Sequence, residues 1–241
     1  MDPVMRPLQP GERFQFACSR QVPCFNECCR DLNQFLTPYD ILRLKRALHL
    51  PSHRFLDRYT TLHSGPQSGL PVVTLRPREG SGRACPFVTP SGCRVYADRP
   101  SSCRTYPLMR MASRSRDSGR VTEQYVLLKE AHCRGFAAGP DRTAAEWIAD
   151  QGVAPYNRMN DMMLSLISLK NLRRPGPLDP GSRDLFRLAC YDLDTFRTEI
   201  ERNGALDGFD VDGATAIHCS DEALLELGHR WIKQNLFGPA T

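Results

Sequence analysis

The chain has 241 residues, with 32 basic and 27 acidic side chains and a formal net charge of +5. Hydrophobic residues make up 41% and charged residues 24%, values that exclude a disordered or fibrous chain and suit one compact domain or two small ones. The unusual feature is the cysteine content, because eight of the ten cysteines lie between Cys18 and Cys133.

The N-terminal residues do not read as a signal peptide, because prolines interrupt them and they contain no apolar run of the required length. The longest apolar-rich run, residues 162–169, is far too short to cross a bilayer. We therefore expect a cytoplasmic protein without membrane contact, in a compartment that keeps thiols reduced. Ten cysteines in that compartment favour metal binding or redox chemistry over the alternative, a secreted disulfide scaffold.

The first predicted helix begins at Thr37, which is followed by a proline and then by Asp40. A capping hydroxyl, a proline at the first helical position and an acid in the first turn are typical of a helix start, and the apolar spacing extends this helix to about residue 50. A second short helix is predicted from Ser52, burying Phe55, Leu56 and Tyr59.

Two strands are predicted, over residues 72–75 and 122–129. We expect them to pair, which would bring the cysteine loops to one end of a small sheet. Residues 111–120, which are rich in serine and arginine, are predicted to form a surface loop.

The last hundred residues have helical periodicity. Thr143 and Glu146 form a predicted capping box, and further helices are predicted from Pro155, over residues 182–204 with a break near 192–194, and over residues 221–236. The expected fold is α+β and mostly α, with a small sheet, cysteine-rich metal-binding loops and a helical C-terminal half. We expect a cysteine-cluster region over residues 1–140 and a helical region over residues 141–241 packed on it.

The clustered cysteines are candidate metal ligands, because soft metals prefer thiolate sulfur and four thiolates complete a tetrahedral site. Eight thiols indicate two four-ligand sites, or one cluster and one mononuclear site. Neighbouring side chains tend to point in different directions, so the adjacent pair Cys28 and Cys29 is easier to place in two sites, or bridging two metals, than in one tetrahedral site. The candidates are Cys18, Cys24, Cys28, Cys29, Cys85, Cys93, Cys103 and Cys133.

Four of these cysteines are followed directly by arginine, namely by Arg30, Arg94, Arg104 and Arg134. Guanidinium groups lower a thiol pKa and offset the negative charge of a thiolate site, so we interpret them as charge compensation. The alternative is that an arginine-rich composition produces such pairs by itself.

A nucleic-acid partner is not expected. Ionising eight thiols and binding two divalent ions would bring the net charge from +5 to +1. A basic loop remains, and we read it as solvated because no aromatic residues are interleaved with its arginines; these are Arg110, Arg114, Arg116 and Arg120. A protein partner could instead bind the C-terminal helices.

Two groups of motifs resemble the YkgJ-type cysteine-cluster family, also called the CxxCxxCC zinc- or iron-chelating domain. The first group is Phe16-x-Cys18, Cys28-Cys29-Arg30, Leu36-Thr37-Pro38-x-Asp40-Ile41 and Phe55-Leu56-x-x-Tyr59. The second, more specific, is Cys85-Pro86-Phe87-x5-Cys93-Arg94-Val95-Tyr96-x-x-Arg99-Pro100-x-x-Cys103-Arg104-x-Tyr106-Pro107, then Cys133-x-Gly135 and Glu146-Trp147-Ile148. The resemblance covers residues 14–150.

The resemblance implies a metal-chelating domain in which all eight clustered cysteines are ligands for zinc or for iron, including a [4Fe-4S] cluster. One departure is that five residues separate Cys18 from Cys24, where the family has two. The resemblance also implies alternatives, a redox protein or a metal-dependent protein-modifying enzyme similar to flagellin lysine N-methylases. The chain has no convincing glycine-rich nucleotide loop to support a methyltransferase.

Overall fold

The computed structural model describes residues 3–66, 68–115, 117–204, 206 and 213–238. Contacts divide the chain into two compact units, each built from two separated stretches. Unit 1 comprises Met1–Gln34 and Leu75–Asn157, and unit 2 comprises Phe35–Thr74 and Arg158–Thr241. The expected boundary between residues 140 and 141 stays a prediction.

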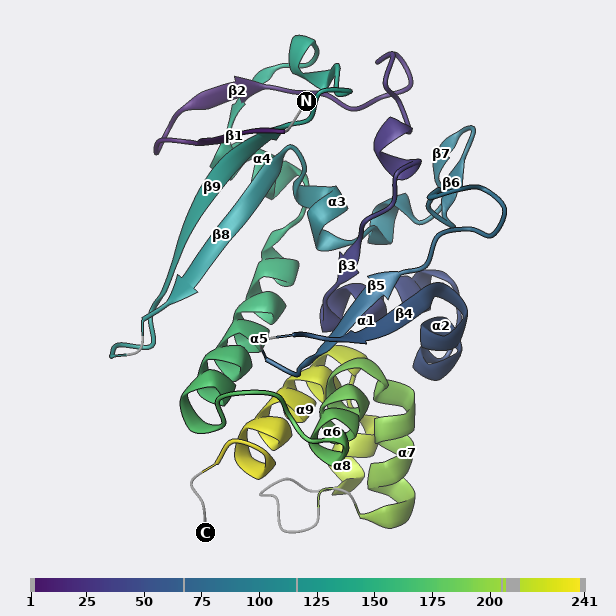
Figure 1. The fold of residues 1–241 in the computed structure, drawn as a ribbon, viewed down its shortest axis with the longest axis vertical. Helices are drawn as coiled ribbons and strands as arrows, with labels where there is room; N and C mark the ends of the chain where they lie inside the picture. Colours follow the sequence, from purple (N-terminus) through teal and green to yellow (C-terminus); the bar gives the residue numbers. More distant parts are fainter. Residues whose placement is uncertain (1–2, 67, 116, 205, 207–212, 239–241) are drawn as a thin grey trace. The chain divides into compact units, whose positions relative to one another are not determined.

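Unit 1 is built on small antiparallel sheets. The largest has the strand order β1-β9-β8 (Figure 1), with β1 spanning Val4–Pro7, β9 spanning Val121–Lys129 and β8 spanning Leu108–Arg114. The two smaller sheets pair β2 (Arg13–Gln15) with β10 (Asp141–Thr143), and β6 (Val88–Thr89) with β7 (Gly92–Cys93).

The other elements of unit 1 are short. They are the 3-10 helices η1 (Glu27–Cys29), η2 (Tyr96–Asp98) and η3 (Gly135–Ala137), and the α-helices α3 (Ser101–Thr105) and α4 (Ala144–Asp150).

The core of unit 1 is aromatic. Phe16 contacts Tyr106, Phe136 and Trp147 edge to face, with ring centroids 5.3–5.5 Å apart, and Trp147 Nε1 donates to the Thr105 carbonyl at 2.9 Å. The buried members of this core are Leu8, Phe14, Phe16, Leu108, Cys133 and Trp147. One cysteine of the cluster, Cys133, is therefore anchored in the apolar interior, and Cys24 packs against the same core.

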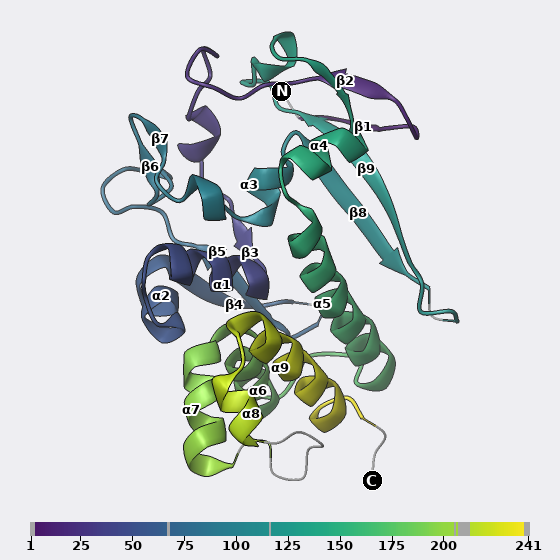
Figure 2. The same ribbon diagram turned by 180° about the vertical axis from the view of Figure 1, so that it is seen from behind.

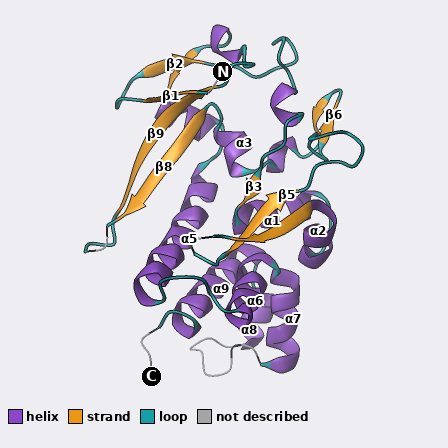
Figure 3. Cartoon of the chain, in the orientation of Figure 1, coloured by secondary structure: helices purple, strands orange, loops and turns teal. Residues whose placement is uncertain are grey.

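Unit 2 is mostly helical (Figures 2 and 3). Its helices are α1 (Pro38–Ala47), α2 (Ser52–Tyr59), α6 (Pro180–Tyr191), α7 (Leu193–Asn203), α8 (Gly213–His218) and α9 (Asp221–Asn235). A three-stranded sheet accompanies these helices and has the order β3-β5-β4, with β3 spanning Phe35–Leu36, β5 spanning Pro71–Leu75 and β4 spanning Thr60–Ser64. Helix α9 approaches α6 closely at Gly228, where a Cβ would lie only 2.2 Å from the Ala189 carbonyl oxygen.

Helix α5 (Ala154–Arg173) begins in unit 1 and continues into unit 2. No helix within the described ranges, α5 included, combines the length and apolarity needed to cross a membrane.

A largely buried ionic network joins helices of unit 2. The Lys45 ammonium on α1, whose side chain is only 6% exposed, lies 2.8 Å from carboxylate oxygens of both Asp194 and Asp221. Asp221 also pairs with Arg197 at 2.9 Å and with Arg46 at 3.3 Å. One lysine therefore connects α1 to α7 and α9.

The predicted α+β class, mostly α, is confirmed, and so are the predicted helix starts. Both capping boxes form, because Thr37 and Thr143 accept from the backbone N–H groups of Asp40 and Glu146, whose side chains accept in return. The predicted break in the segment 182–204 falls at Asp192, which separates α6 from α7.

The predicted pairing of residues 72–75 with 122–129 is wrong. Strand β5 pairs with β3 and β4, whereas β9 pairs with β1 and β8. Residues 111–114, predicted as loop, belong to β8, and the loop proper is shorter. Strands β8 and β9 are joined by a short connection and pair as a hairpin. Strand β9 is therefore paired with its neighbour along the chain and not with the more distant β5. Arg116 of the predicted basic loop lies outside the described residues.

Thr37→Ala tests the cap of α1. We expect the variant to lose about 1 kcal/mol of unfolding free energy, because the backbone N–H of Asp40 loses its acceptor, whereas Thr37→Ser retains the hydroxyl and the stability. The measurement is urea unfolding followed by Trp231 fluorescence in a Trp147→Phe background, since Trp231 lies in unit 2. Equal midpoints for the alanine and serine variants would contradict the cap.

Candidate metal centre

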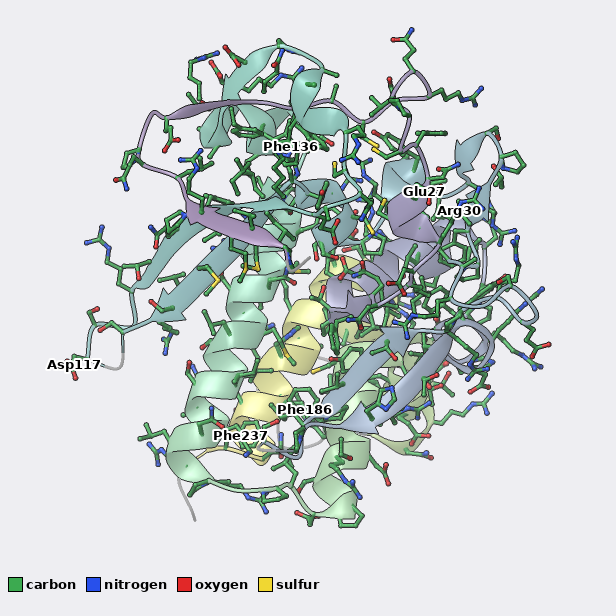
Figure 4. All side chains as sticks on the ribbon, turned by 45° about the horizontal axis from the view of Figure 1, so that its top comes forward. Glu27, Arg30, Asp117, Phe136, Phe186 and Phe237 are labelled. Carbon is green, nitrogen blue, oxygen red and sulfur yellow. The ribbon has the colours of Figure 1, made fainter. Side chains whose placement is uncertain are left out.

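All eight clustered cysteines lie in unit 1, whereas Cys190 and Cys219 lie in unit 2. Cys133 is buried, four thiols are half-buried and three are exposed; the exposed ones are Cys18, Cys28 and Cys103. Figure 4 shows sulfur atoms next to the segment that carries the labelled Glu27 and Arg30. Segments that are far apart in the sequence thus bring their thiols into one unit.

Three of the thiols, Cys18, Cys24 and Cys133, form what we call the first thiol group. The Arg134 backbone N–H donates to Cys24 Sγ at 3.0 Å, and the Ala17 N–H donates to the Gly135 carbonyl at 3.1 Å. These two bonds hold the segment before η1 against the loop after β9. Burial raises the pKa of Cys18 to about 11, and the nearby thiolates of Cys28, Cys24 and Cys133 add to the effect.

Four further thiols, Cys29, Cys85, Cys93 and Cys103, form the second thiol group. The Cys85 N–H donates to the Cys29 carbonyl at 2.7 Å, and Cys93 pairs with Val88 in the β6-β7 hairpin. The hydrogen bond with Cys28 and burial raise the pKa of Cys29, and the thiolates of Cys85 and Cys103 raise it further. Cys103 Sγ donates to Gln34 Oε1 at 3.3 Å.

Cys28 interacts with members of both groups. Its Sγ is 3.9 Å from Cys29 Sγ, and the hydrogen bond between them lowers the pKa of Cys28 while it raises that of Cys29. The Cys28 thiolate also raises the pKa of Cys18, Cys85 and Cys93. It is therefore within electrostatic reach of both groups.

Backbone N–H groups counteract the burial of several thiols. Burial raises the pKa of Cys85, Cys93 and Cys133, but N–H groups two or three residues further along the chain lower it. The donors are Phe87 and Val88 for Cys85, Val95 for Cys93 and Gly135 for Cys133. Such donors stabilise the thiolate, which is the form that binds a metal.

The arginines that follow cysteines have diverse contacts. Arg30 pairs with Glu27 at 3.3 Å (Figure 4), and the Arg134 guanidinium donates to the Ala131 carbonyl at 2.9 Å. Arg94, by contrast, lowers the pKa of the Cys93 thiol that it follows. Charge compensation from these neighbours is therefore uneven.

Arg99, which does not follow a cysteine, also affects the thiols. It is only 8% exposed, and it lowers the pKa of both Cys18 and Cys93. The sequence pattern predicts charge compensation only for arginines that directly follow a cysteine, so Arg99 was named only as part of a motif. Gln34, which contacts Cys103, was missed altogether, since nothing in its sequence surroundings marks it.

The donor set suits a soft metal. All eight candidates are thiols, and backbone N–H groups favour the thiolate at several of them, including Cys28, Cys85, Cys93 and Cys133. Among the residues that the structure describes, no three His, Cys, Asp or Glu side chains are gathered into a group that could already hold a metal ion. His132 is exposed and lies 3.7 Å from Glu130.

Comparison with known proteins gave one informative match. The model of a family described as "CxxCxxCC: Putative zinc- or iron-chelating domain" matches residues 17–134. The matched segment begins just before Cys18 and ends just after Cys133, so it contains both thiol groups and Cys28. No curated protein and no solved structure matches the chain.

Proposed function

We propose that the protein binds zinc or iron through its eight clustered thiols, because residues 17–134 match the model of the CxxCxxCC family of zinc- or iron-chelating domains. The observation that carries the proposal is that all eight of these thiols lie in unit 1, although they come from three separate stretches of sequence. Cysteines that served only as small apolar residues would have no reason to gather.

We propose further that Cys28 completes the first thiol group, so that each group supplies four ligands. This division is supported by the backbone bonds that join Cys24 to the loop after Cys133, and Cys85 to Cys29. Each set matches the four thiolates of a tetrahedral zinc site or of an iron–sulfur cluster. The thiols must be reduced to bind a metal, and we therefore propose a reducing compartment such as the cytoplasm.

The two metals would supply different chemistry. Zinc held by four thiolates would be structural, whereas an iron–sulfur cluster would supply electron transfer. Anaerobic purification followed by metal and sulfide analysis of one sample distinguishes them. A colourless protein with zinc supports a structural site, and a brown protein with iron and sulfide supports a cluster. Absence of both metals would overturn the proposal. The methylase-like alternative and the protein partner for the C-terminal helices stay predictions.

Cysteine variants test the ligand assignment. Cys133→Ser and Cys103→Ser are each expected to remove about half of the bound metal, because each breaks one of two four-thiolate sites. The matched control is Cys219→Ser, a half-buried cysteine of unit 2 whose Sγ donates to the Ala216 carbonyl, a bond that serine can keep. Metal content is measured on anaerobically purified protein. Unchanged metal in both ligand variants would contradict the assignment.

A further inference from the structure

Strand β8 forms one edge of the sheet β1-β9-β8 (Figure 1). Two backbone bonds fix the phase of its hydrogen bonding. The Ser115 N–H donates to the Arg120 carbonyl at 2.9 Å, and the Leu128 N–H donates to the Pro107 carbonyl at 2.8 Å. Bonded and non-bonded pairs alternate along an antiparallel ladder. Every second residue of β8, counted from Leu108, therefore directs its backbone N–H and carbonyl away from β9, toward the edge.

The opposite edge of this sheet, strand β1, is protected against a further strand. It has only four residues. The Leu8 N–H donates to the Tyr125 carbonyl at 2.9 Å, so the alternation makes Met5 and Pro7 the outward-facing residues of β1. Pro7 has no N–H to donate to another strand. Strand β8 has seven residues and no proline, so it is the better of the two edges for pairing.

Charged side chains often guard an open edge, but the two arginines of β8 contact their own hairpin. The side chain of Arg110 is only 13% exposed, and its Nε lies 2.7 Å from a carboxylate oxygen of Glu123 on β9. The Arg114 guanidinium lies beside Gly119, where a Cβ would be 2.9 Å from one of its nitrogens. Both contacts lie within the hairpin of β8 and β9, so neither arginine is committed to covering the edge.

One face of this sheet packs on the aromatic core of unit 1, through Leu108 and Leu127 among others. Side chains alternate between the two faces along a strand, and directly opposed residues share a face. The other face is apolar and includes two largely exposed methionines, Met5 at 58% and Met111 at 52%. We call this surface the methionine face, and its members are Met5, Met109, Met111, Val126 and Leu128.

The sequence of β8, LMRMASR, is complementary to itself in one antiparallel register. A two-fold axis through Met111 pairs all seven residues of two copies and places Ala112 of one copy opposite Arg110 of the other. In this register Met111 meets Met111 of the second copy, and no two arginines are directly opposed. Moving the axis by one residue opposes Arg110 either to itself or to Arg114, and directly opposed like charges are destabilising.

We propose that the β8 edge is a homodimer interface, at which two copies of the chain pair their β8 strands antiparallel about Met111 to form one six-stranded sheet. The pairing supplies partners for the outward-facing backbone groups of β8. It also covers the exposed Met111 with an apolar side chain. A second copy fits this edge because the full-length register is the one that separates the arginines.

Met111→Glu is the decisive variant. Met111 is half exposed, so a single chain tolerates the carboxylate, but the dimer would oppose two carboxylates at its axis. The matched control is Met5→Glu, which adds the same charge to the same face on the other edge strand. A second variant, Ala112→Pro, removes an outward-facing N–H while the bonds from β8 to β9 remain.

Sedimentation equilibrium of the anaerobically purified full chain, from about 1 to about 100 µM, measures self-association. We expect the wild type and Met5→Glu to approach twice the mass of one chain. Met111→Glu and Ala112→Pro should each raise the dissociation constant at least about tenfold. Mixing Met111→Glu with Met111→Lys should restore the dimer, because opposite charges then face each other at the axis.

A wild-type chain that stays monomeric over the whole range would overturn the inference, and so would a dimer that survives Met111→Glu. An equal loss in Met5→Glu, or no recovery on mixing the glutamate and lysine variants, would also overturn it. Trp147 emission reports whether unit 1 is folded in each variant, since Trp147 lies in its core. Should Met111→Glu disturb that emission, Ala112→Pro, which changes no side chain at the axis, decides by the same criterion.

Discussion

Removal of the metal is expected to unfold unit 1 while unit 2 stays folded. The elements that carry the thiols are too short to be stable alone: β6 and β7 have two residues each, η1 has three and α3 has five. Structural zinc contributes about 10–16 kcal/mol to the folding of small zinc-binding peptides. That amount is comparable with the whole stability of an ordinary domain, about 5–15 kcal/mol.

The two tryptophans of the chain make this expectation measurable, because each unit contains one. Trp147 lies in the core of unit 1 and donates to the carbonyl of Thr105 on α3, two residues after Cys103. On anaerobic addition of a strong chelator, Trp147 emission in a Trp231→Phe protein should shift to the red. Trp231 emission in a Trp147→Phe protein should not. A shift of both, or of neither, would contradict a structural role confined to unit 1.

The second large effect is expected in unit 2, from Lys45→Met. The substitution keeps most of the side-chain volume but removes the ammonium that lies 2.8 Å from Asp194 and Asp221. Because the half-buried Asp194 loses its lysine partner and Asp221 keeps only its two arginines, we expect a loss of about 2 kcal/mol of unfolding free energy. Urea unfolding monitored through Trp231 measures it.

The control for Lys45→Met is Arg158→Met, which removes a more exposed ion pair with Glu226 in the same unit. Exposed pairs are worth little, so this variant should lose less than about 1 kcal/mol. Equal losses in the two variants would show that burial of the lysine has no special effect.

The same network predicts a pH dependence. Burial raises the pKa of Asp194 and Asp221, but Lys45 and the other donors lower it by more, so both values lie below the ordinary one in the folded protein. The stability that they contribute is therefore present above the unfolded pKa, about 3.9, and is lost as the pH falls through the folded pKa. The stability of Lys45→Met should depend less steeply on acid pH than that of wild type.

Much of the helical structure could be predicted from the sequence, because helix starts depend on neighbouring residues. Thr37 with Asp40, and Thr143 with Glu146, satisfy each other's backbone groups within one turn. Strand pairing depends on residues far apart. The expected pairing of β5 with β9 was wrong because β9 forms a local hairpin with β8, whose sequence LMRMASR has no clear strand pattern.

The candidate site could be predicted as a set of residues but not as an arrangement. Spacing indicates that the cysteines act together, whereas their grouping depends on backbone bonds such as Cys85 N–H to the Cys29 carbonyl. The arginines illustrate the same limit. The side chains of adjacent residues point in different directions, and Arg30 pairs with Glu27 instead of with a thiol. The arginine that lowers the pKa of thiols in both groups is Arg99, which does not follow a cysteine.

The division of unit 1 into two stretches has a consequence for biosynthesis. A ribosome releases Cys29 well before Cys133, and residues 35–74 of the other unit emerge in between. At about 5–20 residues per second, the first thiols wait roughly 5–20 s for their last partner. During that interval the nascent chain exposes the four thiols up to Cys29, and later three more, all of which can be oxidised or can bind the wrong metal ion. Correct loading therefore depends on the redox state and the metal supply around the chain while it is still being made.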